Sequence, residues 1–89
     1  MDYNKVQEHA KELVAKYLNA NRPGERTYRP FDVYVVWYCK TLQNAKVLLS
    51  TDVVDGLYFE VTYNGGKREY YLDAYTKAHN EAVRLEELQ

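Results

Sequence analysis

Tyrosine is the residue type whose number and spacing first suggest a binding surface in this chain. The 89-residue sequence holds ten tyrosines. Four strands are predicted below, and successive side chains of a strand point to opposite faces of the sheet. This alternation predicts that some of the tyrosines share one sheet face with charged residues. The tyrosines of this set are Tyr34, Tyr38, Tyr58 and Tyr71, and the charges among them are Lys46, Glu60 and Glu69. Such a face can stack a base or dock on a protein. The alternative is that the tyrosines pack under a helix with their hydroxyls reaching solvent, and both interpretations stay open.

Arginine is the second residue type that could bind a partner. Three arginines, Arg22, Arg26 and Arg29, fall in an irregular linker over Asn21–Phe31 that also holds both prolines. The linker could be a small anion-binding loop, but most loop charges only keep a connection solvated, and we favour that second interpretation. A fourth arginine, Arg68, follows a predicted hairpin turn.

The residues that could support catalysis or metal binding are few and scattered. Cys39 is the only cysteine, and His9 and His79 are the only histidines. A nucleophile needs a base and an orienting group beside it, and no pair here has the CxxC or HxxxH spacing of metal ligands. The chain also has no glycine-rich phosphate loop. We therefore predict no catalytic residue, no metal, no cofactor and no enzymatic activity.

Length and composition indicate one soluble globular domain over residues 1–89. The hydrophobic fraction is 46%, the charged fraction is 28% and the net charge is −1. A near-neutral chain lacks the basic stripe that nucleic-acid binding requires. The single cysteine suits a reducing cytoplasm. We see no secretory signal at the N-terminus and no apolar run long enough to span a membrane.

Apolar periodicity predicts a helix at each end of the chain. The first is expected at about Asn4–Asn19, with Asp2 or Asn4 as its cap. The second is expected at about Asp73–Leu88, with Asp73 as its cap. Residues spaced by three and four form an apolar stripe on each helix. The stripes consist of Val6, Ala10, Leu13, Val14 and Tyr17 in the first helix, and of Tyr75, Ala78, Ala82, Leu85 and Leu88 in the second.

Four strands are expected between the two helices. Their predicted ranges are Val33–Lys40, Ala45–Thr51, Leu57–Tyr63 and Lys67–Leu72. Turn signals at Asp55-Gly56 and Asn64-Gly65-Gly66 separate them, since Asn and Gly tolerate positive φ. The connections are too short for parallel crossovers. The predicted fold class is therefore α+β, an antiparallel four-stranded meander flanked by an N-terminal and a C-terminal helix (α-β-β-β-β-α).

Strict alternation also predicts which strand residues form the core. In the first strand Val33, Val35, Trp37 and Cys39 should face one way, and Tyr34, Val36 and Tyr38 the other. Trp37 is accordingly expected in a core that it shares with Val35, Leu49, Phe59 and Val61.

Three segments of the chain resemble a known family. They are VVWYCKTLQN at Val35–Asn44, DGLYFEVTYNG at Asp55–Gly65 and YLDAY at Tyr71–Tyr75. In these segments the chain resembles small proteins of bacteriophages and prophages of Gram-positive bacteria, grouped as a domain of unknown function. The resemblance implies a phage accessory protein in the cytoplasm of the bacterial host. Such proteins commonly block a defence system. The resemblance brings no known catalytic residues to carry over to this chain.

Two functions agree with these observations. One is a protein-binding inhibitor that docks an aromatic patch on a host or defence protein. The other is a sponge that sequesters a nucleotide-derived immune signal, with tyrosines stacking the base and arginines pairing with phosphates. We favour the inhibitor, because the predicted fold leaves little volume for a concave site and the charge is near neutral. A homodimer through the tyrosine face or an edge strand is also expected, because strand edges and exposed faces need cover.

Overall fold

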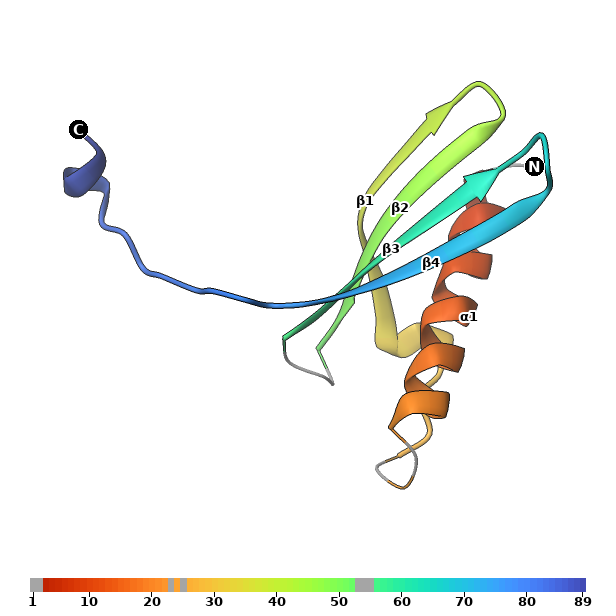
Figure 1. Ribbon diagram of the computed structural model, residues 1–89, viewed down its shortest axis with the longest axis horizontal. Helices are drawn as coiled ribbons and strands as arrows, with labels where there is room; N and C mark the ends of the chain where they lie inside the picture. The colour runs from red at the N-terminus through yellow and green to blue at the C-terminus, as the bar shows by residue number, and fades with distance from the viewer. Residues whose placement is uncertain (1–2, 23, 25, 53–55) are drawn as a thin grey trace.

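The fold is an antiparallel meander with one helix on one of its faces (Figure 1). The computed structural model describes residues 3–22, 24, 26–52 and 56–89. Helix α1 spans Tyr3–Asn21 and a 3-10 turn, η1, spans Pro30–Asp32. Strands β1 (Val33–Thr41), β2 (Asn44–Thr51), β3 (Leu57–Asn64) and β4 (Glu69–Thr76) form one sheet in sequence order. The predicted four-stranded meander and N-terminal helix are confirmed.

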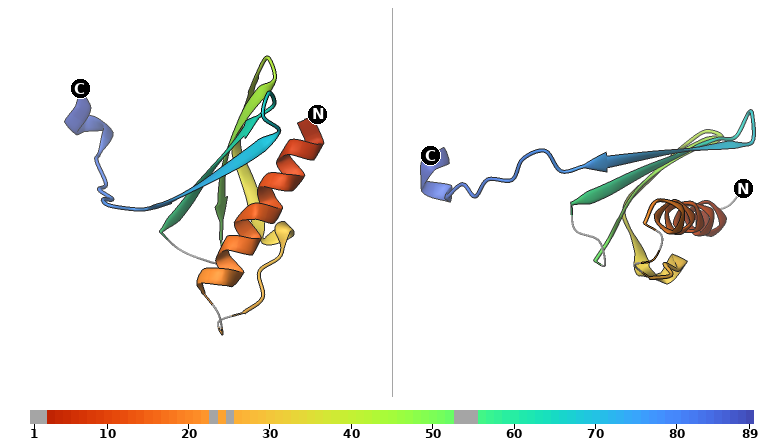
Figure 2. Two further views of the ribbon diagram at one scale, coloured as in Figure 1. Left: turned by 45° about the vertical axis from the view of Figure 1, so that its right-hand side comes forward. Right: turned by 60° about the horizontal axis from the view of Figure 1, so that its bottom comes forward.

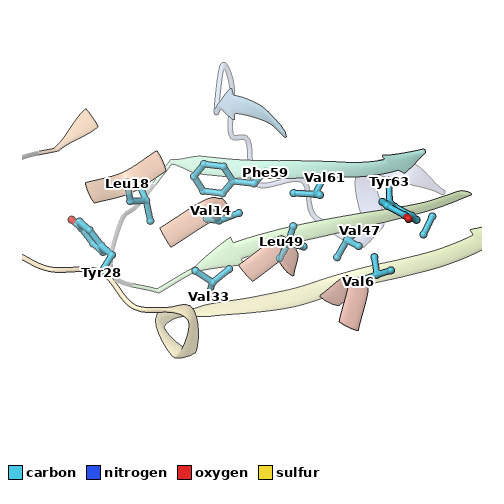
Figure 3. Packing of buried hydrophobic residues seen from close by; sticks show 12 residues of the cluster. Val6, Val14, Leu18, Tyr28, Val33, Val47, Leu49, Phe59, Val61 and Tyr63 are labelled. Atoms are coloured by element: carbon cyan, nitrogen blue, oxygen red, sulfur yellow. The ribbon is translucent and has the colours of Figure 1, made fainter. Parts of the chain in front are cut away.

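Helix α1 packs its predicted apolar stripe on one face of the sheet, here called the inner face (Figures 2 and 3). Val6, Ala10 and Val14 are buried, and Leu13 and Tyr17 pack against them. The helix begins before its predicted cap Asn4, which lies inside it, and Asp2 falls outside the described residues.

The inner face of the sheet supplies the other half of the core. Its fully buried side chains alternate along the strands, as the pleat requires. They are Val33 from β1, Val47 and Leu49 from β2, and Phe59 and Val61 from β3. The rings of Phe59 and Tyr17 meet edge to face, with centroids 5.8 Å apart. The predicted core positions Leu49, Phe59 and Val61 are confirmed.

A β-bulge in β1 overturns the prediction for Trp37. Val35 lies opposite Leu49, but the next paired residue, Trp37, lies opposite Leu48, so β1 has one extra residue at this point. An extra residue reverses the alternation beyond it. Trp37 and Cys39 therefore lie on the opposite face, here called the outer face, and Trp37 is 48% exposed. The prediction of Trp37 as a core residue is wrong.

The predicted C-terminal helix over Asp73–Leu88 is also wrong. Its first residues continue β4, which pairs with β3 as far as Thr76 opposite Leu57. Beyond them residues 77–89, here called the C-terminal arm, extend away from the sheet and end in a 3-10 turn, η2, at Leu85–Leu88 (Figures 1 and 2). A short helix is marginal unless it buries its apolar face, whereas pairing with β3 gives residues 73–76 their hydrogen bonds directly.

The two hairpin tips touch each other at Gly65. The predicted turn after Asn64 is present at residues 65–68. Its positive φ belongs to Arg68 (56°), so Gly65 is required for a different reason. A Cβ on Gly65 would lie 2.1 Å from the backbone oxygen of Gln43 in the β1–β2 turn. The Gly65 N–H also donates to Asn44 Oδ1 (3.1 Å), so the glycine allows the two turns to pack closely.

Substitution at the two neighbouring glycines should therefore differ in effect. Gly65→Ala should lower the free energy of unfolding by about 1–3 kcal/mol, the usual cost of forcing extra volume into a packed site. Gly66→Ala is the matched control, because a Cβ there meets its nearest neighbour at an ordinary 3.5 Å. Urea unfolding monitored by circular dichroism measures both. Equal loss in the two variants would contradict the close approach at Gly65.

Candidate functional site

The outer face of the sheet carries a band of partly exposed aromatic side chains, here called the aromatic band. Each strand except β2 contributes to it. The band consists of Tyr34 and Trp37 from β1, Tyr58 from β3, and Tyr71 and Tyr75 from β4. Helix α1 lies on the inner face, and within residues 3–22, 24, 26–52 and 56–89 no segment covers the outer face (Figure 2).

Strand register explains how these rings come together. Tyr58 lies directly opposite Tyr75, so the two rings share one cross-strand row. Trp37 lies opposite Leu48, which is half-buried beside it. Directly opposite residues on one sheet face have Cβ atoms about 5 Å apart, so their side chains can contact each other. The band is therefore set by the rigid sheet and not by loops.

Sequence reasoning found part of this band. The predicted tyrosines Tyr34, Tyr58 and Tyr71 share the outer face. Tyr38 does not, because the bulge turns it to the inner face, where it packs against the core. Trp37 was missed for the same reason, since a bulge leaves no clear mark in a run of β-branched and aromatic residues. Tyr75 was assigned to a helix, although the alternation Tyr71-x-Asp73-x-Tyr75 already matched an outward strand face.

Charged residues lie between the aromatic rings. Lys46 Nζ lies 3.6 Å from Glu60 Oε1, and Glu60 stands opposite Asp73 on β4. The Tyr71 hydroxyl donates to Glu69 Oε2 (2.6 Å), and this bond is the main cause of the raised pKa of Tyr71. The interleaved charges Lys46, Glu60 and Glu69 predicted from the sequence thus do lie on the outer face with the tyrosines. They give the surface a polar pattern around its apolar rings.

A cavity opens at one end of the aromatic band, where the sheet divides into two hairpins. The β2–β3 register ends at Leu49 opposite Phe59, although β2 continues to Thr51 and β3 begins at Leu57. The cavity at this division has a volume of about 560 Å³, within the range of small-molecule sites. Its lining includes Tyr34, Ser50, Asp52, Tyr58, Tyr75 and Lys77.

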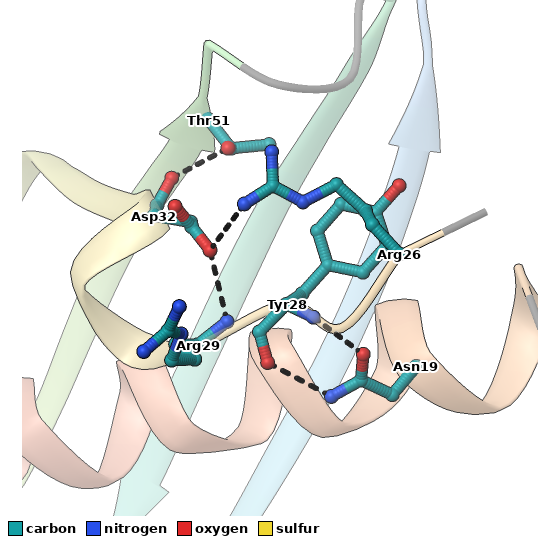
Figure 4. A network of polar contacts seen from close by, with 6 residues as sticks. All are labelled: Asn19, Arg26, Tyr28, Arg29, Asp32 and Thr51. Atoms are coloured by element: carbon teal, nitrogen blue, oxygen red, sulfur yellow. Dashed lines mark hydrogen bonds and ion pairs between the residues drawn. The ribbon is translucent and has the colours of Figure 1, made fainter.

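Two of the predicted linker arginines, Arg26 and Arg29, lie apart from the outer face and contact their own segment (Figure 4). Arg26 Nη2 lies 3.3 Å from Asp32 Oδ2, and its guanidinium stacks over the Tyr28 ring. The backbone N–H of Arg29 donates to the same carboxylate oxygen (3.0 Å), and its guanidinium lies over Phe31. Arg26 and Arg29 thus help to shape the linker.

The linker is held to helix α1 by a reciprocal pair of hydrogen bonds. Asn19 Oδ1 accepts from the backbone N–H of Tyr28 (2.7 Å), and Asn19 Nδ2 donates to the Tyr28 carbonyl (2.9 Å).

Arg22 follows the end of α1, and Arg68 lies in the β3–β4 turn. The structure therefore brings none of the four predicted arginines to the lining of the cavity at the tyrosines.

Cys39 and the two histidines lie in three separate places. Cys39 is on the outer face opposite Lys46, with Sγ 3.9 Å from Thr41 Oγ1. His9 Nδ1 lies 2.8 Å from the Tyr70 hydroxyl on the α1 side, and burial raises the pKa of Tyr70 to about 12. His79 pairs with Glu81 (2.9 Å) in the arm. Among the described residues no three His, Cys, Asp or Glu side chains cluster as metal ligands do.

Most of the chain matches a family of related sequences. A family model described as "Family of unknown function (DUF6275)" matches residues 7–85. The chain belongs to this family. No curated protein and no solved structure matches it significantly. The match includes α1 from residue 7 onward, the whole sheet and the C-terminal arm as far as residue 85. No helix in the described part of the chain is long and apolar enough to cross a membrane.

Proposed function

We propose that this protein is a non-enzymatic binding module that docks on another protein through its aromatic band. One observation carries the proposal: the outer face displays Tyr34, Trp37, Tyr58, Tyr71 and Tyr75 on a rigid sheet with no described segment over them. Exposed aromatic patches of this kind typically mark interaction sites. Tyrosine and tryptophan are also the residues that most often supply binding hot spots.

Geometry supports a broad protein partner better than a small ligand. The rings come from three strands and spread across the sheet, while Lys46, Glu60 and Glu69 supply polar contacts among them. An open sheet face with apolar rings and interspersed charges resembles the mix of anchors and polar contacts found in protein interfaces.

We further propose that the partner is a host or anti-phage defence protein that this module inhibits, in the cytoplasm of a bacterial host. Support comes from the resemblance of Val35–Asn44, Asp55–Gly65 and Tyr71–Tyr75 to small phage and prophage proteins. The family itself is described only as one of unknown function, so the identity of the partner rests on experiment.

Site-specific photocrosslinking tests the docking surface. Benzoylphenylalanine in place of Trp37 should capture a foreign protein in phage-infected, defence-positive bacteria, because position 37 lies within the aromatic band. The matched control carries the same group at Lys16, which is exposed on α1. Position 16 should give no such adduct. An adduct from position 16 alone, or from neither position, would overturn the proposal.

A second candidate function rests on the cavity where the sheet divides. Its volume of about 560 Å³ and its three tyrosines suit a stacked base, as a sponge for a nucleotide-derived immune signal requires. Lys77 is the one cation among the described residues of its lining, and the four predicted arginines lie elsewhere, so a ligand phosphate would have few charged partners. Native mass spectrometry of protein purified from infected cells distinguishes the sponge from the protein-binding module. A retained nucleotide at near-stoichiometric occupancy would favour the sponge.

A further inference from the structure

We infer that the C-terminal arm, residues 77–89, docks on the outer face of a second copy of this chain, so that two copies exchange arms. The inference rests on the proposed function in one respect, because it uses the same aromatic band as a protein-binding surface. Three features of the described chain support it: the composition of the arm, the direction in which it leaves the sheet, and the match between its reach and the sheet.

The arm carries apolar side chains that no described segment of its own chain buries. All of its residues are exposed, including Leu85 at 65% and Leu88 at 74%, and Val83 is also half-exposed. Three large aliphatic side chains left in water lose the stabilisation that burial would supply. The family match continues through residue 85, so most of the arm belongs to the sequence that defines the family.

The exit of the arm directs it away from its own sheet. The backbone N–H of Lys77 donates to the Gly56 carbonyl (2.8 Å), which fixes the chain at the end of β4. From there the arm runs outward as a continuation of that strand (Figures 1 and 2). Folding back over its own outer face would require a sharp reversal directly after this bond. The segment KAHNEAVRLEELQ contains neither glycine nor proline, the residues that tight turns use most.

The outer face of a second copy offers the arm an aromatic surface that the arm is long enough to cross. Fully extended, the arm reaches about 40 Å at roughly 3.3 Å per residue. That length exceeds an eight-residue strand, so the arm can cross a whole sheet. The aromatic band of one copy would cover Val83, Leu85 and Leu88 of the other. Each copy would bind the arm of its partner, so the assembly would be a closed two-fold dimer. A domain of 89 residues buries a limited share of its own surface and gains stability from such cover.

The single natural cysteine makes a direct test possible, because Cys39 lies on the outer face. A tagged chain with Leu85→Cys and Cys39→Ser is mixed with the untagged natural chain under mild oxidation. Arm exchange predicts a disulfide between position 85 of one chain and Cys39 of the other, since the Cα atoms must approach within about 7 Å. A tagged chain with Lys16→Cys and Cys39→Ser is the matched control and should form at least about tenfold less of the mixed product.

A third chain distinguishes exchange from folding back. With Leu85→Cys and the natural Cys39 together, exchange predicts a covalent dimer. An intrachain disulfide would instead show that the arm covers its own sheet, and would overturn the inference. Light scattering adds a measurement without cysteine chemistry: the natural chain should be dimeric at high micromolar concentration, Leu85→Asp monomeric, and Glu87→Gln dimeric. A monomeric natural chain would overturn the inference as well.

Failure of this inference is separable from failure of the proposed function. If the natural chain is monomeric and the mixed disulfide is absent, but position 37 still captures a foreign protein, arm exchange is wrong and the docking surface stands. If position 37 captures neither a foreign protein nor a second copy, the aromatic band binds no protein and both are wrong.

Discussion

Phe59→Ala should lower the free energy of unfolding by about 3–5 kcal/mol, the largest stability loss expected from a single substitution in this chain. Phe59 is fully buried on the inner face, and its ring contacts Tyr17 on α1 edge to face. Truncation removes the apolar surface that joins the helix to the sheet and leaves a cavity. Domains of this size have total stabilities of about 5–15 kcal/mol, so the variant should be close to unfolding. Urea denaturation monitored by circular dichroism measures the loss.

The adjacent residue provides the matched control. Tyr58 precedes Phe59 in β3 but points to the outer face, where its side chain is partly exposed. Tyr58→Ala should cost about 1 kcal/mol or less, as substitutions away from the core usually do. A larger loss for Tyr58→Ala than for Phe59→Ala would mean that the two faces have been assigned the wrong way round.

Trp37→Ala should weaken binding to the crosslinked partner by at least about 2 kcal/mol, close to thirtyfold in Kd. Trp37 combines a large ring with a position inside the aromatic band, opposite Leu48. Because it is half-exposed in the free chain, its loss should leave folding nearly intact while removing a contact anchor. Isothermal titration calorimetry with the purified partner measures Kd, and thermal unfolding of the same sample confirms that the variant is folded.

Lys16→Ala is the control for this binding loss. Lys16 is an exposed residue of α1, away from the outer face, so its removal should change Kd by less than about twofold, within the usual scatter of neutral interface substitutions. Equal weakening in both variants would point to a partner that contacts the helix side of the domain.

Local sequence signals were sufficient for most of the fold. The apolar stripe from Val6 to Tyr17 predicted α1 and the side that it buries. Alternation in Leu57–Tyr63 placed Phe59 and Val61 in the core, because a half-buried strand has a period of two. The turn after Asn64 was also found, although the need for Gly65 arises from contact with Gln43, a residue distant in sequence.

Two features depended on tertiary structure that the sequence does not display. The bulge in β1 adds one residue between Val35 and Trp37, and only the register with β2 shows where the alternation reverses. That single shift moved Trp37 outward and Tyr38 inward, so it altered the candidate site as well as the core. The residues from Asp73 to Thr76 fit a helical stripe and a strand equally well, and pairing with β3 decided between them.

Fluorescence of Trp37 tests most directly the claim on which the site depends, that the bulge turns this side chain to an open outer face. Trp37 is the only tryptophan, so the emission comes from one position. In dilute solution, and in Leu85→Asp at any concentration, we expect emission shifted toward that of tryptophan in water and efficient quenching by acrylamide. Concentrating the natural chain should shift the emission to the blue as arms dock. Blue, quencher-resistant emission from Leu85→Asp, in which no arm docks, would place Trp37 in the core and contradict the aromatic band.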